Sequence, residues 1–171
     1  VIDATIAIID NSALSDINNI DELIEKSNLQ GPDFPTYGEI KDNGGIRDSL
    51  LNGRGSFKIR AKHLIEKKDN DKTSIVFTEL PYQVNKAKLI ENIAQLVRDK
   101  KINEISQLRD ESDKDGMRLV VEIKRGEQHE VVLGSLYKHT NAQISYSVNM
   151  VCLVDGEPKT LGFTEIINEF I

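Results

Sequence analysis

The chain has 171 residues, of which 39% are hydrophobic and 29% charged, and its formal net charge is −6. These values are typical of one globular domain, with or without a small appendage, and they argue against a wholly basic nucleic-acid-binding protein. No apolar run approaches the roughly 18 residues that a membrane span needs, and the first residues do not have the pattern of a signal segment. A single cysteine, Cys152, excludes an internal disulfide framework, so we expect a reducing compartment such as the cytoplasm.

Charge is distributed unevenly along the chain. Residues 1–45 carry 9 acidic and 2 basic side chains, residues 46–110 carry 9 and 14, and residues 111–171 carry 10 and 6. The middle segment is therefore the part whose charge favours phosphate binding. A solvated face of mixed charges is the alternative interpretation of the same counts.

The first third of the chain predicts short helices around a break. Apolar residues at nearly every turn of Val1–Asp10 predict a buried helix, and the acidic pair Asp21 and Glu22 favours the start of a helix over Ile20–Ser27. Residues 30–36 hold two prolines and a glycine, which indicates a linker and a domain boundary. Gly45–Leu51 is expected to form a helix that Asn52-Gly53 ends.

Strict alternation predicts a strand over Ser56–Lys62. Its inward residues are Phe57, Ile59 and Ala61, and its outward residues are Lys58, Arg60 and Lys62. Like charges side by side repel, and no acid separates these three cations. We therefore expect the outward face to bind an anion.

The remaining elements follow from periodicity and turn residues. We expect a hairpin turn over Lys67–Lys72, a strand over Thr73–Leu80 ended by Pro81, and an amphipathic helix over Lys86–Lys101 capped by Asn85. We further expect a charged turn over Arg109–Gly116, a strand over Met117–Ile123, and a helix over Glu127–Thr140 whose inward residues are Val132, Leu136 and Tyr137. A strand over Ile144–Val154 should follow, with a turn at Asp155-Gly156, and then a last helix capped by Thr164. This irregular alternation predicts an α+β fold: a mainly antiparallel sheet with helices packed against it, and short helical flanks at both ends.

No catalytic or metal-binding constellation stands out. The histidines His63, His129 and His139 are scattered, without a second ligand at helical or turn spacing. None of the four tyrosines, Tyr37, Tyr82, Tyr137 and Tyr146, stands beside an activating arginine or a metal cluster. Gly53-Arg54-Gly55 is compatible equally with a phosphate contact and with a plain turn. The residues alone therefore indicate an α+β domain with one basic strand face.

Several blocks, in order and at matching spacing, resemble the A subunits of bacterial type IIA DNA topoisomerases, DNA gyrase and topoisomerase IV. The blocks are Gly31-Pro32-Asp33-Phe34-Pro35-Thr36, Gly53-Arg54-Gly55-Ser56, Arg60-Ala61-Lys62, Glu79-Leu80-Pro81-Tyr82-Gln83-Val84-Asn85-Lys86, Leu108-Arg109-Asp110-Glu111-Ser112, Asp115-Gly116-Met117-Arg118, Leu136-Tyr137-Lys138-His139-Thr140 and Asn149-Met150. The Gly-Arg-Gly-Ser and Leu-Tyr-Lys-His-Thr blocks look more like gyrase, so gyrase is expected over topoisomerase IV.

The resemblance implies a place within a larger protein. Residues 1–30 correspond to the tail of a winged-helix DNA-gate domain, 31–160 to the tower domain, and 161–171 to the start of the helix that leads to the exit gate. The family's catalytic tyrosine lies upstream, so no catalytic residue is carried over. No cofactor is expected in this segment, because Mg²⁺ and ATP are held by the B subunit. The implied partners are double-stranded DNA, the B subunit, and another copy of the A subunit in an A2B2 enzyme, within the cytoplasm at the nucleoid and without a membrane.

The tower of this family flanks the gate and supports bent DNA, which agrees with the basic strand face. The predicted DNA-backbone contacts are Arg54, Lys58, Arg60 and Lys62, with Lys86, Lys88 and Lys138 as further candidates. Two other hypotheses stay open: a free-standing DNA-binding module, and a scaffold without DNA contact. The chain starts and stops inside expected helices and is acidic overall, which favours a segment of a larger enzyme over a free-standing module.

Overall fold

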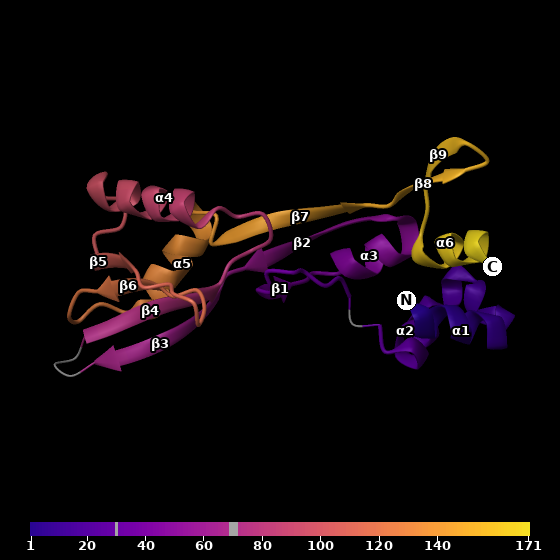
Figure 1. Ribbon diagram of the computed structural model, residues 1–171, viewed down its shortest axis with the longest axis horizontal. Coiled ribbons are helices and arrows are strands. Elements are labelled where there is room, and N and C mark those ends of the chain that lie inside the picture. Colours follow the sequence, from indigo (N-terminus) through magenta and orange to yellow (C-terminus); the bar gives the residue numbers. More distant parts are fainter. Residues whose placement is uncertain (30, 69–71) are drawn as a thin grey trace. The chain divides into compact units, whose positions relative to one another are not determined.

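A computed structural model of the chain describes residues 1–29, 31–68 and 72–171 (Figure 1). The described residues form two compact units, each made of discontinuous segments. Unit 1 comprises Val1–Asp33, Asp42–Phe57 and Ser145–Ile171, and unit 2 comprises Phe34–Lys41 and Lys58–Ile144. Helices and antiparallel strands are mixed along the chain, which confirms the predicted α+β class.

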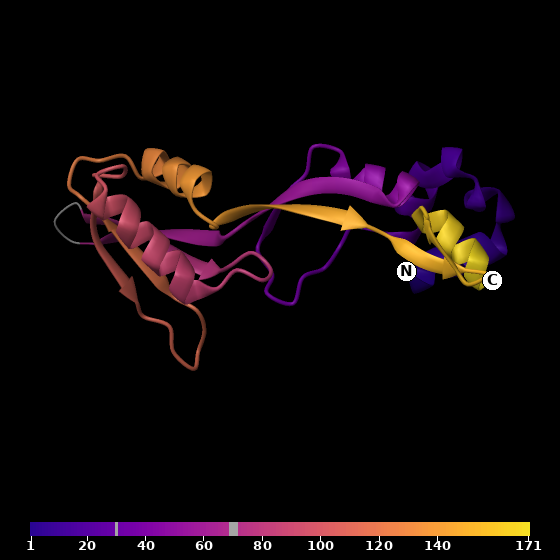
Figure 2. The ribbon, with the colours of Figure 1, turned by 90° about the horizontal axis from the view of Figure 1, so that it is seen from above.

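Unit 2 is built on a four-stranded antiparallel sheet in the order β3-β4-β6-β5. Its strands are β3 (Lys62–Lys68), β4 (Lys72–Glu79), β5 (Ile105–Asp110) and β6 (Leu119–Ile123). The helices α4 (Lys86–Arg98) and α5 (His129–His139) cover one face of this sheet (Figures 1 and 2). Alternate residues of β4 and β6, such as Phe77 and Val121, pack there against the apolar sides of both helices. The helices contribute Leu89 and Ile93 from α4 and Leu136 from α5. The predicted inward residues of α5, Val132, Leu136 and Tyr137, are buried as expected.

A three-stranded sheet holds β1 (Glu39–Lys41), β2 (Arg54–Arg60) and β7 (Gln143–Asn149). The predicted inward residues Phe57, Ile59 and Ala61 are all buried, which confirms the alternation. The prediction of one strand over Ser56–Lys62 is wrong in its extent, because β2 ends at Arg60 and Lys62 begins β3 in the other sheet. The change of sheet occurs at Ala61, whose N–H donates a hydrogen bond to the Ala142 carbonyl at 2.7 Å.

Unit 1 is mainly helical. It contains α1 (Ile2–Asp10), two 3₁₀ turns (Ser12–Ser15 and Ile17–Asn19), α2 (Ile20–Ser27), α3 (Gly45–Asn52), α6 (Phe163–Phe170) and a hairpin of β8 (Val151–Val154) with β9 (Glu157–Thr160). Its core is formed by Ala4, Ile8, Leu14, Ile20, Leu23 and Ile167. The first helix is confirmed, but its expected burial is wrong, since the side chains of Ile2 and Ile9 are 76% and 63% exposed.

Several boundaries differ from the expectations for identifiable reasons. The charged turn does not begin at Arg109, because Arg109 and Asp110 still pair with β6. Helix α4 ends at Arg98 because Lys100 adopts a left-handed φ of +56°. Met150 separates β7 from β8 and donates its N–H to the Gly53 carbonyl. Thr164 is buried and does not cap α6; the cap is Gly162, whose N–H donates to the Glu165 carboxylate at 2.7 Å. Part of the predicted turn at Lys67–Lys72 lies outside the described residues.

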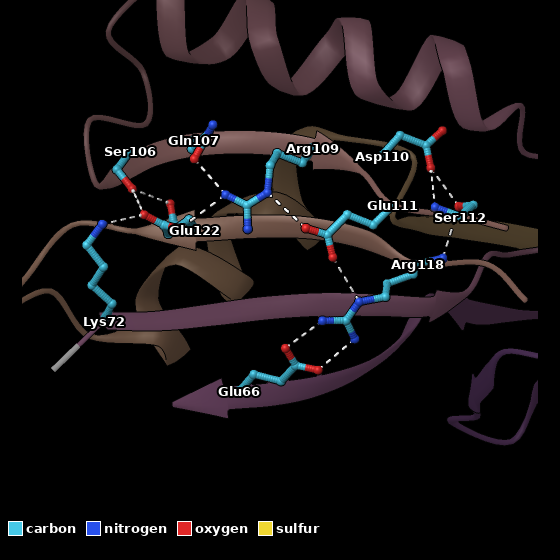
Figure 3. Close-up of polar contacts among 10 residues, drawn as sticks. All are labelled: Glu66, Lys72, Ser106, Gln107, Arg109, Asp110, Glu111, Ser112, Arg118 and Glu122. Carbon is cyan, nitrogen blue, oxygen red and sulfur yellow. Dashed lines mark hydrogen bonds and ion pairs between the residues drawn. The ribbon is translucent and has the colours of Figure 1, made fainter. Parts of the chain in front are cut away.

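The face of the unit 2 sheet opposite the helices is covered by a network of ion pairs (Figure 3). Arg118 donates two hydrogen bonds to Glu66, at 2.6 and 2.7 Å, and one to Glu111 at 3.0 Å. Arg109 bridges Glu111 and Glu122, and Lys72 completes the series at 3.1 Å from Glu122. Val76 and Val120 are paired across β4 and β6 in the row that contains Arg109, and both are at most 1% exposed. The charged side chains therefore shield apolar residues of the sheet without leaving excess charge.

The same network lowers carboxyl pKa values. A hydrogen bond from Lys86, followed by two from Ser112, lowers the pKa of Asp110 from 3.8 to about 2. Lys72 lowers the pKa of Glu122, and Arg118 and Arg109 lower that of Glu111. Each carboxylate is thus stabilised in its charged form by a partner that folding supplies.

These shifts predict acid sensitivity with a defined sign. A carboxyl whose pKa is depressed by folding adds stability above its unfolded pKa and loses it as the pH falls through the folded pKa. For Asp110 this contribution is present above 3.8 and is lost on approach to about 2. In urea unfolding between pH 5 and pH 2, Lys86→Met should flatten the fall in stability. The same change at the exposed Lys88 is the control, and equal curves for both variants would contradict the assignment.

Two glycines of unit 1 allow close backbone packing between α3 and β2. A Cβ added to Gly45 would lie 1.9 Å from the Ser56 carbonyl oxygen, and one added to Gly55 would lie 1.9 Å from that of Gly45. Both obstacles are backbone atoms, so no side-chain rotation can relieve them. By contrast, a Cβ on Gly134 of α5 would meet nothing within 4 Å.

Alanine at these positions should therefore have opposite effects. Gly45→Ala should lower the free energy of unfolding by about 1–3 kcal/mol, because the backbone must move to admit the methyl group. Gly134→Ala should raise it by about 0.5–1 kcal/mol, as expected for a helix interior with free space. Chemical denaturation of both variants measures the difference. Similar values for the two would show that the contact at Gly45 adjusts without cost.

Candidate nucleic-acid interface

The pairing of β1 with β2 creates a basic face in unit 2. Glu39 lies opposite Arg60, Ile40 opposite Ile59, and Lys41 opposite Lys58. Directly opposed residues of antiparallel strands share a face, so Glu39, Lys41, Lys58 and Arg60 project from one side. Ile59, on the other side, is fully buried.

Lys41 and Lys58 place two like charges directly across from each other. Such a pair is destabilising unless an opposite charge lies between or above it. Lys41 is 3.6 Å from Glu39, whereas Lys58 is exposed and forms no ion pair within the described part of the chain. Sequence reasoning missed Lys41 because a three-residue strand carries no alternation pattern; only its register against β2 reveals it.

Arg60 is held in a defined orientation. Its Nε donates to Gln143 Oε1 at 2.6 Å, and its guanidinium carbon lies 4.9 Å from the centre of the Tyr137 ring. The Tyr137 hydroxyl donates to the Ala61 carbonyl at 2.9 Å. Burial, with a smaller effect of Glu39, raises the pKa of Tyr137 to about 12. Tyr137 therefore stays protonated and acts as a support for Arg60; a nucleophile would require the opposite shift.

Lys62 differs from the other cations of the predicted face. It lies 3.2 Å from Glu79 Oε1, while Oε2 of the same carboxylate accepts the Gly38 N–H at 2.8 Å. No acid separates the three cations in the sequence, but in the structure Lys62 is paired with an acid, because β4 supplies Glu79 from a distant part of the chain. Lys62 contributes less free charge to this face than Lys58.

The structure distributes the other predicted contacts more widely. Arg54 belongs to unit 1 and donates to Thr160 Oγ1 at 3.4 Å. Lys86 forms an ion pair with Asp110 at 2.7 Å, and Lys88 is exposed on the same helix. Lys138 is exposed on α5 and lines a cavity together with Arg60. Among the predicted contacts in unit 2, Lys62 and Lys86 are paired with acids, whereas Lys58, Arg60, Lys88 and Lys138 form no ion pair within the described residues.

This arrangement suits binding of a phosphate backbone. Lysine and arginine contacts of this kind hold a nucleic acid electrostatically and do not read its bases. The described part of the chain contains no cluster of three or more His, Cys, Asp or Glu side chains placed to hold a metal ion. Among the same residues no helix combines the length and apolarity needed to cross a bilayer.

Comparison with known proteins places this chain in a family. The family of the A subunits of DNA gyrase and topoisomerase IV matches residues 1–171. The chain is 51% identical to the DNA gyrase A subunit of Buchnera aphidicola subsp. Acyrthosiphon pisum and 49% identical to that of Pseudomonas aeruginosa, each over 100% of this chain. The protein of the same name from Clostridium acetobutylicum is 48% identical over 100% of this chain. The chain covers only 20%, 18% and 20% of these three relatives. On this likeness, the chain belongs to the family of DNA gyrase and topoisomerase IV A subunits.

Proposed function

We propose that this chain is a segment of a DNA gyrase A subunit that holds the backbone of DNA beside the gate where the complete enzyme cleaves both strands. The observation that carries the proposal is the basic face of β1 and β2, where Lys41 and Lys58 oppose each other. Family membership supplies the DNA partner, and the geometry supplies a surface with charge available for phosphate. Contacts of this kind would offset part of the energy needed to bend DNA.

The wider assignment follows the family. Residues 31–160 are proposed to form the tower, residues 1–30 to end the winged-helix domain, and residues 161–171 to begin the helix toward the exit gate. The nucleophilic tyrosine is proposed to lie elsewhere in the full-length protein, with Mg²⁺ and ATP on the B subunit. The complete enzyme would be an A2B2 topoisomerase that supercoils DNA in the cytoplasm, at the nucleoid.

Two alternatives are supported by specific observations. The matching family includes topoisomerase IV, so a decatenating enzyme is the alternative identity of the whole protein. A scaffold without DNA contact is supported by the ion pairs of Lys62 with Glu79 and of Lys86 with Asp110, which neutralise two of the predicted contacts. The scaffold hypothesis does not explain why Lys41 and Lys58 face each other.

Charge reversal on the basic face tests the proposal. The full-length protein should bind a labelled duplex of roughly 30 base pairs with an affinity that falls as salt rises. Lys58→Glu/Arg60→Glu should weaken this binding by about tenfold or more and reduce its salt dependence, because two phosphate contacts are lost.

A matched control carries the same change of net charge elsewhere. Lys100 and Lys101 are exposed where α4 leads into β5, so Lys100→Glu/Lys101→Glu alters total charge but leaves β2 intact. If both double variants weaken binding equally, only net charge matters. If neither variant affects binding or strand passage, the scaffold hypothesis is correct.

A further inference from the structure

Beside the basic face, unit 2 contains a cavity of about 410 Å³ between α5 and the strands β2 and β7. Its walls differ in character. Arg60 and Lys138 contribute positive charge, whereas Leu133, Gly134 and the Tyr137 ring form an apolar floor. A cation beside an apolar surface matches the two chemical parts of a nucleic-acid backbone, a charged phosphate and a largely apolar sugar face.

The guanidinium of Arg60 is held so that its two terminal amino groups are available to a ligand. Gln143 occupies Nε, and the Tyr137 ring supports the plane of the group. The two terminal amino groups of Arg60 form no hydrogen bond within the described residues, and together they can donate in parallel to two oxygens of one phosphate. A lysine cannot replace this planar fork, since its ammonium acts as a point charge.

The nearby acids do not occupy this donor pair. Glu39 faces Arg60 across β1 and β2, but its carboxylate lies 3.6 Å from Lys41. Glu130 lines the cavity and lies 3.2 Å from His129 Nε2. Within the described residues no carboxylate forms an ion pair with the Arg60 guanidinium. The charged lining of the cavity, Arg60, Lys138 and Glu130, therefore keeps an excess of one positive charge.

We propose that this cavity binds one sugar–phosphate unit of a DNA strand. The phosphate accepts hydrogen bonds from both terminal amino groups of Arg60, Lys138 adds charge at the edge, and the deoxyribose packs on Leu133, Gly134 and Tyr137. Gln143 and Tyr137 are positioning residues that act through Arg60. This inference rests on the proposed function. It goes further, because Arg60 would bind one phosphate at a defined position and thereby set the register of the DNA strand on the basic face.

Three substitutions that preserve net charge test the subsite in the full-length protein. Arg60→Lys removes the fork, Gln143→Leu removes its anchor, and Gly134→Leu fills the floor. The last change meets free space on an exposed helix position, so the protein should fold normally. Each variant should bind a roughly 30-base-pair duplex about tenfold more weakly at fixed salt. The slope of log affinity against log salt should not change, because the number of cations is the same.

Lys58→Gln is the contrasting variant, since it removes one diffuse contact and should lower that slope by about 0.9. Thermal unfolding of every variant separates loss of binding from loss of structure. If Arg60→Lys and Gly134→Leu both bind like the unaltered protein while Lys58→Gln lowers the slope, the basic face is correct and the subsite is wrong. If Lys58→Gln also changes nothing, the proposed function itself fails.

Discussion

The directions of Arg60 and Lys62 depend on how the backbone of Ala61 between them is held. Its N–H donates to the Ala142 carbonyl at 2.7 Å, and its own carbonyl accepts the Tyr137 hydroxyl at 2.9 Å. Ala61 is completely buried, so each of these polar groups would carry a large penalty if it were unpaired. Both partners come from the segment that includes α5 and leads into β7. This pair of hydrogen bonds fixes the point where the chain leaves one sheet and enters another, and hence the directions of Arg60 and Lys62 on either side.

Unit 2 uses its charged residues in two physically different ways. On the outer face of the four-stranded sheet, arginines and glutamates pair with each other over buried valines, so the charges stabilise the fold and leave little field for a ligand. On the face of β1 and β2, Lys41 and Lys58 oppose each other and only Lys41 has a nearby acid. Repulsion there costs stability in the free protein, which is the usual condition at a surface that binds an anion.

Local patterns in the sequence are sufficient to predict most elements of the fold. Helix α2 has the predicted bounds, Asn85 caps α4 through a hydrogen bond from the Lys88 N–H, and alternation identifies the inward residues of β2. The failures concern interactions between distant segments. Strand β1 is too short to have a period, β5 consists largely of polar residues that only pairing with β6 organises, and Glu79 neutralises Lys62 from another strand. For the same reason the sequence indicates Arg60 as a contact but gives no indication of Gln143 or of the cavity.

The blocks through which the family resemblance is visible mostly have structural explanations. Val84 donates its N–H to the Pro81 carbonyl, Gln83 adopts a left-handed φ of +64°, and Asn85 caps α4, so Glu79–Lys86 forms a turn that positions a helix. Arg109 and Arg118 belong to the ion-pair network. Such blocks therefore identify the fold and say less about which residues contact DNA. Lys41 and Lys58 lie outside the blocks. Arg60-Ala61-Lys62 is the exception, because these three consecutive residues contain both the buried point where the chain changes sheets and the proposed phosphate contact. A substitution at Ala61 would therefore alter both folding and DNA binding, whereas a substitution at Arg60 or Gln143 tests DNA binding separately from folding.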